Sequence, residues 1–195
     1  MRIILASASQ RRRELMEKLN IKYEVLAYDH EEIFDSNKTI YDQCMDVSYQ
    51  KGKVVFNDII DDVIVISCDT IVALDGIIYG KPKDNEDAFN MIKKLQGRTH
   101  EVITALTVFS RVNGISNVEQ TYEKALVTVD TMSDKEIREW VDTGEALGKA
   151  GSYGIQDSFG KFVLKIEGDY YSIVGLPLNK LYNILKKIEV YDELR

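Results

Sequence analysis

An acidic residue inside a long apolar run is the feature that most constrains this chain. The run, V63-I-V-I-S-C-D-T-I-V-A-L74, carries Asp69 and Thr70 among residues of buried type. It is too short and interrupted to span a bilayer, and its β-branched residues favour a central strand covered on both faces. An isolated buried carboxylate is costly unless a metal, a cation or a proton compensates it. Asp69 therefore indicates either chemistry or a strand end at which it caps a turn.

Composition restricts the class of protein. The chain has 195 residues, 45% of them hydrophobic, which suffices for one sizeable core or for two small lobes around a cleft. Its net charge of −7 argues against bulk affinity for nucleic acid or anionic membranes, so we expect neither as a partner. Cys44 and Cys68 lack metal-binding spacing and fit a reducing compartment. We therefore expect a cytoplasmic protein without disulfides.

A candidate anion site follows the first predicted strand, over residues 2–6. The segment S7-A-S-Q10 leads into a predicted amphipathic helix over Arg11–Leu19, so backbone N–H groups and the helix dipole would point at one spot. Three arginines, Arg11 to Arg13, stand where positive charge opposes the dipole unless an anion lies opposite. Successive helical residues point about 100° apart, so at most two arginines can face one pocket. The alternative is three solvated arginines.

The rest of the chain alternates strand and helix patterns without repeats. The expected elements are a helix over Ile40–Phe56, a hairpin at Asp75-Gly76 leading to I77-I-Y-G-K81, a helix over 84–95, strands over 102–110 and 122–131 joined near Asn113-Gly114, a helix from Ser133 to Val141, a strand over 162–166 and a final helix after Gly175. These predict one α/β domain over residues 1–195, with a smaller lobe at roughly 100–145.

Two loops carry candidate functional residues. Glu31 and Glu32 lie in an acidic stretch whose simplest reading is a solvated loop. The segment K149-A-G-S-Y-G-I-Q156 is rich in small residues, so it either lets its backbone approach a flat ligand or merely connects two elements.

These residue types together suit phosphoanhydride chemistry. Lys and Arg neutralise phosphate oxygens, while carboxylates bind a hard divalent ion such as Mg²⁺ or activate water. The sequence contains no G-x-x-x-x-G-K-[ST] loop and no G-x-G-x-x-G turn, which excludes the usual P-loop and dinucleotide-binding motifs. It also lacks a nucleophile motif and H-E-x-x-H, which argues against a nucleophilic triad and catalytic zinc.

Six motifs then occur together over about residues 3–186: L5-A-S-A-S-Q-R-R-R-E-L15, S67-C-D-T-I-V72, G80-K-P-K-D84, L95-Q-G-R-T-H-E-V102, K149-A-G-S-Y-G-I-Q156 and E167-G-D-Y-Y-S-I-V-G-L-P-L178. In this order and spacing they resemble the Maf family of nucleotide pyrophosphatases, also called septum formation proteins. The resemblance implies a mixed elongated sheet with flanking helices in two lobes around a central cleft, as in inosine triphosphate pyrophosphatases. It also implies a homodimer that hydrolyses a nucleoside triphosphate to the monophosphate and pyrophosphate with Mg²⁺, Mn²⁺ or Co²⁺.

The resemblance also assigns residues. Asp69 matches the family's catalytic acid, the proton acceptor for the attacking water, and we expect Asp69 and Glu32 to contact the metal. The cleft residues expected to hold phosphate oxygens are Ser7, Arg12, Lys51 and Lys81.

A further set of matches concerns the base. Arg12, Thr70 and Gln156 match positions of the dTTP/UTP branch. One amide offers both a donor and acceptors, so Gln156 can match the O4 and N3–H edge of thymine or uracil. A site built on such pairs disfavours cytosine, which would leave buried groups unpaired.

Two departures from the family pattern bear on the site. Gly148 stands where L-D-K-A-G is usual, so the lost carboxylate could free Lys149 or loosen the loop that carries Gln156. Gly52 replaces the usual Ala after Lys51 and would weaken its helix by up to about 1 kcal/mol.

Two other readings stay open. One is a nucleotide-sensing regulator of cell division that acts through a protein partner, with hydrolysis incidental. The other is an inosine or xanthosine triphosphatase, which has the implied fold but different motifs at Ser7–Arg13 and at Gln156.

Overall fold

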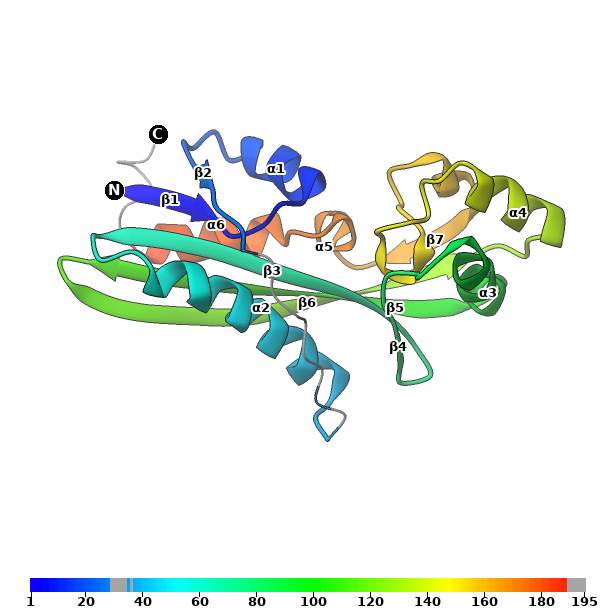
Figure 1. Ribbon diagram of the computed structural model, residues 1–195, viewed down its shortest axis with the longest axis horizontal. Helices are drawn as coiled ribbons and strands as arrows, with labels where there is room; N and C mark the ends of the chain where they lie inside the picture. The colour runs from blue at the N-terminus through cyan, green and yellow to red at the C-terminus, as the bar shows by residue number, and fades with distance from the viewer. Residues whose placement is uncertain (29–34, 36, 189–195) are drawn as a thin grey trace. The chain divides into compact units, whose positions relative to one another are not determined.

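The computed structural model describes residues 1–28, 35 and 37–188 (Figure 1). Its elements are β1 (Arg2–Leu5), α1 (Gln10–Glu17), β2 (Glu24–Val25), α2 (Ile40–Asn57), β3 (Val63–Leu74), β4 (Ile77–Tyr79), α3 (Asn85–Leu95), β5 (Thr99–Val112), β6 (Ile115–Val129), α4 (Asp134–Asp142), the short 3-10 helices η1 (Ala150–Ser152) and η2 (Ser158–Phe162), β7 (Val163–Glu167), α5 (Tyr170–Val174) and α6 (Leu178–Lys187).

The described strands form a seven-stranded mixed sheet in the order β2-β1-β3-β5-β6-β7, with β4 paired to β3. Strand β1 runs parallel to both β2 and β3, whereas β4 pairs with β3 and β7 with β6 in the antiparallel sense. The hairpin predicted at Asp75-Gly76 joins β3 to β4, and both residues have the positive φ that such tight turns require. The predicted α/β class, a mixed sheet with flanking helices, is confirmed.

The chain divides into two compact units. The first consists of Met1–Asp69, Thr104–Glu123 and Gly175–Arg195, and the second of Thr70–Ile103 and Lys124–Val174. The smaller lobe expected at roughly 100–145 overlaps both units and stays a prediction.

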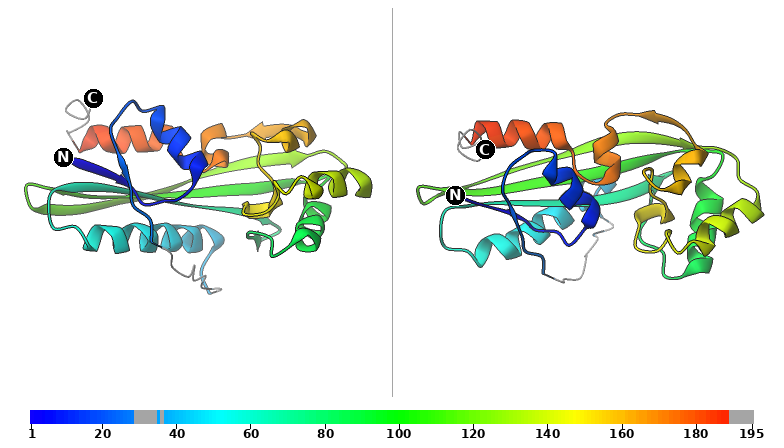
Figure 2. Two further views of the ribbon diagram at one scale, coloured as in Figure 1. Left: turned by 45° about the horizontal axis from the view of Figure 1, so that its top comes forward. Right: turned by 90° about the horizontal axis from the view of Figure 1, so that it is seen from above.

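In the first unit, β3 is covered on both faces, as its apolar run predicts. Val63 and Val65 pack with Val55 and Phe56 of α2 in one apolar cluster, so the odd-numbered residues of the strand face α2. Figure 2 shows α2 and α6 on opposite sides of the strands of this unit. Asp69 has the same parity as Val63 and Val65, and its side chain therefore also points toward α2.

The helices begin where the sequence supplies caps. The side chains of Thr39 and Asp84 accept hydrogen bonds at the starts of α2 and α3. Ser133 and Glu136 form the predicted capping box of α4, in which each side chain bonds the other residue's backbone. The predicted bounds of α2, α3 and α4 hold to within one or two residues.

The hairpin of β5 and β6 is longer than predicted. Its turn lies at Asn113-Gly114, as expected, but β6 begins at Ile115 rather than near Tyr122. Residues 115–119 are largely exposed, so this part of the strand shows no alternation of apolar and polar residues. The sequence pattern therefore revealed only the buried part of the strand.

The core of the second unit surrounds an aromatic cluster. Phe159 is fully buried and packs against Trp140, Tyr153 and Phe162, with ring centroids 4.7–5.5 Å apart. His100 lies beside this cluster, 2% exposed, with its Nε2 atom 2.6 Å from the Tyr153 hydroxyl. Burial lowers the pKa of His100 to about 4 and raises the pKa of Tyr153.

The depressed pKa of His100 makes stability depend on pH. Below pH 6.5 the unfolded chain protonates this histidine while the folded protein does not, until the pH approaches 4. Stability should therefore fall by about 3 kcal/mol as the pH drops from 6.5 to 4 and receive no further penalty from this group below that. Urea unfolding across this range checks it. The double variant H100L/Y153F should lose less stability than wild type, and an equal loss would contradict the assignment.

No helix in the described ranges is both long and apolar enough to cross a membrane.

Candidate functional site

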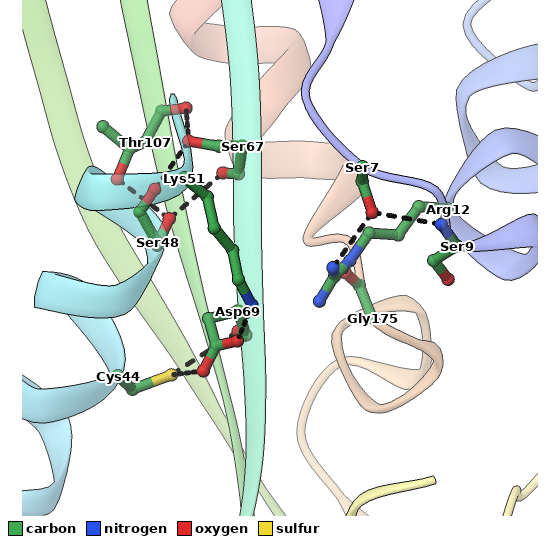
Figure 3. A network of polar contacts seen from close by, with 10 residues as sticks. All are labelled: Ser7, Ser9, Arg12, Cys44, Ser48, Lys51, Ser67, Asp69, Thr107 and Gly175. Atoms are coloured by element: carbon green, nitrogen blue, oxygen red, sulfur yellow. Dashed lines mark hydrogen bonds and ion pairs between the residues drawn. The ribbon is translucent and has the colours of Figure 1, made fainter. Parts of the chain in front are cut away.

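The site begins with a buried ion pair on β3. Asp69 is the seventh residue of this strand, 5% exposed, and its Oδ1 atom lies 2.6 Å from Nζ of Lys51 on α2 (Figure 3). Because Asp69 lies in mid-strand and pairs with a cation, the alternative of a carboxylate that caps a turn is wrong. The pair explains how the sheet holds this carboxylate out of water.

A cysteine completes the surroundings of Asp69. Cys44, which lies two turns before Lys51 on α2, has its Sγ atom 3.5 Å from the Asp69 carbonyl oxygen and 3.8 Å from Oδ2. Burial, and next the Asp69 charge, raise the pKa of Cys44, so the thiol stays protonated and can donate to these oxygens. The pKa of Cys68 is raised to about 11 by burial, and both cysteines are free, as expected.

A polar network fixes α2 against the strands. Ser67 Oγ donates to the Ser48 carbonyl at 2.8 Å, and Ser48 Oγ lies 2.9 Å from Thr107 Oγ1 on β5. The helix approaches closely at Gly52, where an added Cβ would lie 2.4 Å from Ser67 Oγ and 2.7 Å from the ring of Phe109. This contact places Lys51, the residue before Gly52, within reach of Asp69.

The predicted anion site also lies in the first unit. Arg12 donates from Nη1 to Ser7 Oγ at 3.2 Å and from Nε to the Gly175 carbonyl at 2.9 Å. Ser7 Oγ also accepts from the Ser9 backbone, and no acidic residue occupies the first turn of α1. Figure 3 shows Lys51 directed at Asp69 and Arg12 directed at Ser7 and Gly175, and the positive charges of Arg12 and Lys51 both act to lower the Cys44 pKa against its burial. The charges of Arg12 and Lys51 therefore both act on Cys44, while Lys51 pairs directly with Asp69.

The structure brings together only some of the predicted site residues. Asp69 pairs with Lys51, and Arg12 with Ser7. Thr70 follows Asp69 in β3, so its side chain points to the opposite face of the strand. Glu32 lies outside the described residues.

Lys81 and Gln156 belong to two linked segments of the second unit. Lys81 follows β4, and Gln156 follows η1. The backbone N–H of Gly151 donates to the Gly80 carbonyl at 3.1 Å, which joins the segment before Lys81 to the loop that carries Gln156.

The expected consequence of Gly148 is not seen at Lys149. Its ammonium forms an ion pair with Asp157 Oδ2 and lies 3.9 Å from Glu145 Oε2. Lys149 is therefore not freed by the missing carboxylate, and the pair closes the loop on itself. No sequence pattern indicates Asp157, because an ion pair across a loop has no periodic spacing. The position of Cys44 does carry such a signal, since it lies seven residues before Lys51 and thus on the same face of the helix.

A divalent metal fits the donor set at Asp69. Mg²⁺ in phosphate sites is commonly held by one or two carboxylates together with substrate oxygens, rather than by a protein cage. Residues 1–28, 35 and 37–188 contain no cluster of three ligating side chains, and Asp69 offers a single carboxylate, whose Oδ1 atom pairs with Lys51. Asp69, with substrate phosphates, is thus the described residue that could hold such an ion.

Comparisons with known proteins agree with this chemistry. A family model described as Maf-like protein matches residues 2–188. A dTTP/UTP pyrophosphatase of Clostridium beijerinckii is 43% identical over 194 residues, covering 97% of this chain and 100% of that protein. One from Caldanaerobacter subterraneus is 43% identical over 187 residues, covering 96% and 89%. The solved Staphylococcus aureus Ham1 protein matches 66% of this chain and 72% of its own with 18% identity, but its TM-score of 0.42 adds nothing to the assignment.

Proposed function

Because the chain belongs to the Maf-like protein family, we propose that it is a nucleoside triphosphate pyrophosphatase that hydrolyses dTTP and UTP. The proposal includes modified pyrimidine nucleotides as further substrates of the same reaction. The observation that carries the proposal is the buried Asp69–Lys51 pair in mid-strand, with Arg12 and Ser7 in the same unit. A carboxylate beside cations is what water activation next to a phosphate requires.

In the proposed reaction, Asp69 accepts a proton from water as the water oxygen bonds to the α-phosphorus. The bond from that phosphorus to the oxygen bridging to the β-phosphate breaks, and its electron pair leaves with pyrophosphate. A nucleoside monophosphate is the other product. Nζ of Lys51 lies 2.6 Å from Oδ1 of Asp69 and holds this carboxylate in place as the base.

The phosphates are proposed to bind to Ser7, Arg12, Lys51 and Lys81. Ser7 supports this role because its oxygen accepts from Arg12 and Ser9, so its own proton can go to a phosphate oxygen. A divalent metal, Mg²⁺, Mn²⁺ or Co²⁺, held by Asp69 and Glu32, would neutralise charge on the phosphates. The homodimer and the cytoplasmic location stay predictions.

The base is proposed to be selected by Gln156, together with Arg12 and Thr70. An amide that pairs with O4 and N3–H of thymine or uracil meets the reverse pattern in cytosine, so CTP and dCTP should be poor substrates. The reading as a regulator of cell division gains no support from any contact in the described part of the chain.

The test is a substrate panel with product analysis. Pyrophosphate and monophosphate should form from dTTP and UTP in the presence of Mg²⁺, Mn²⁺ or Co²⁺, with little turnover of dCTP, dATP, dGTP or ITP. Chelation of the metal serves as the control. Release of orthophosphate and a diphosphate, or preference for ITP, would contradict the proposal.

A further inference from the structure

The loop that ends in Gln156 is fixed to the core of its unit by several polar contacts. The Trp140 indole donates to the Ser152 carbonyl at 2.9 Å, and the neighbouring Tyr153 hydroxyl lies 2.6 Å from His100 Nε2. Gly151 packs so closely on Val72 that an added Cβ would come within 2.9 Å of it. The backbone before Gln156 is thus held in one arrangement.

The side chain of Gln156 lies directly on this fixed backbone. Gly154, which follows Tyr153, starts a turn in which its carbonyl accepts from the Asp157 backbone N–H at 3.2 Å. An added Cβ at Gly154 would lie 3.4 Å from Gln156 Nε2 and 2.0 Å from Asp157 Oδ2. The terminal amide of Gln156 therefore rests against the residue next to Tyr153. A shift of Tyr153 would move this amide.

The buried His100–Tyr153 pair lowers the stability of the core that contains it. His100 Nδ1 is buried and has no hydrogen-bond partner among the described residues. If the Tyr153 hydroxyl donates to Nε2, the Nδ1–H group is left alone, and the opposite tautomer leaves two groups unpaired. Apolar residues of similar shape would fill this space without such a penalty. A buried polar pair of this kind fixes one geometry where apolar packing would accept several.

We propose that Tyr153 and His100 are positioning residues that set the place of the Gln156 amide and thereby the discrimination between thymine or uracil and cytosine. This inference rests on the proposed function, in which Gln156 contacts the base. Tyr153 acts through its hydroxyl and His100 through Nε2, and neither needs to touch the nucleotide.

The experiment measures the ratio of kcat/KM for dTTP to that for dCTP in wild type, Tyr153→Phe, Gln156→Ala and the variant that combines the two. Tyr153→Phe keeps the aromatic ring and removes only the hydroxyl. It should lower the ratio about tenfold, because displaced hydrogen-bonding groups read the base less well. In the Gln156→Ala background the same change should leave the ratio unaltered, since the two residues act in series.

Two further variants distinguish an effect on the position of Gln156 from a general loss of stability. The double variant Tyr153→Phe/His100→Leu removes both polar partners and should fold at least as well as Tyr153→Phe, yet keep the lowered ratio. Ile137→Val, in a fully buried residue of the same core, should reduce the unfolding midpoint without changing the ratio.

The positioning role is overturned if Tyr153→Phe leaves the ratio of kcat/KM for dTTP to that for dCTP unchanged. It is also overturned if Tyr153→Phe lowers this ratio equally in the Gln156→Ala background. If Gln156→Ala keeps the wild-type ratio while dTTP is still hydrolysed, base reading by Gln156 is wrong and the inference falls with it, but the proposed reaction stands. If wild type releases no pyrophosphate from dTTP, the proposed function itself fails.

Discussion

Asp69→Asn is expected to leave a folded protein whose turnover of dTTP falls by about 10²- to 10⁴-fold. The amide has nearly the shape of the carboxylate, and its oxygen can still accept from Lys51, which now lies 2.6 Å from Oδ1. It cannot accept a proton from water at neutral pH. Steady-state release of pyrophosphate measures the loss.

The binding of a non-hydrolysable dTTP analogue provides the control for this variant. Binding should persist, because Arg12 keeps its hydrogen bonds to Ser7 Oγ and to the Gly175 carbonyl. Turnover within tenfold of wild type would remove Asp69 from the role of base. Loss of the cooperative unfolding transition would instead make the residue structural.

Lys51→Met is expected to lower the free energy of unfolding by about 3 kcal/mol at neutral pH. The methionine side chain fills similar volume but leaves Asp69, which is 5% exposed, without the cation that lies closest to its Oδ1 atom. The loss belongs at the lower end for broken buried pairs, because Lys51 keeps 17% of its side chain exposed and water screens part of the interaction. Urea unfolding followed by circular dichroism measures it.

The double variant Lys51→Met/Asp69→Asn distinguishes charge from packing. If the cost arises from an unpaired buried carboxylate, removing that charge should recover most of the lost stability. If the double variant is as unstable as Lys51→Met, the aliphatic part of the lysine was the important contact. The same pair of variants gives a coupling energy for the two residues.

The sequence predicted those parts of the fold in which buried residues recur with the period of a helix or a strand. The run from Val63 to Leu74 indicated a strand covered on both faces, and the Asp84 and Ser133 caps marked two helices. It missed the first residues of β6, because an exposed strand has no apolar alternation to detect. The spacing of apolar residues reveals an element only where one of its faces is buried, so an exposed segment cannot be detected in this way.

In the candidate site, the sequence indicated single residues but not the residues with which they pair. Single residues such as Asp69 and Arg12 were found because each conflicts with its surroundings, one as a buried charge and the other as a cation at a helix start. Their partners depend on contacts between distant segments. Nothing in the sequence alone paired Lys149 with Asp157, or Tyr153 with His100 across 53 residues.

The close approach at Gly52 has a consequence for how this chain can change over generations. Gly52→Ala would raise the helix propensity of α2, but this chain cannot accept the alanine while Ser67 and Phe109 keep their present positions, 2.4 and 2.7 Å from the added methyl group. An alanine at position 52 therefore requires that Ser67 or Phe109 shift or be replaced by a smaller side chain. Position 52 is therefore sterically coupled to positions 67 and 109, and a change at one of them decides which residues the other can accept.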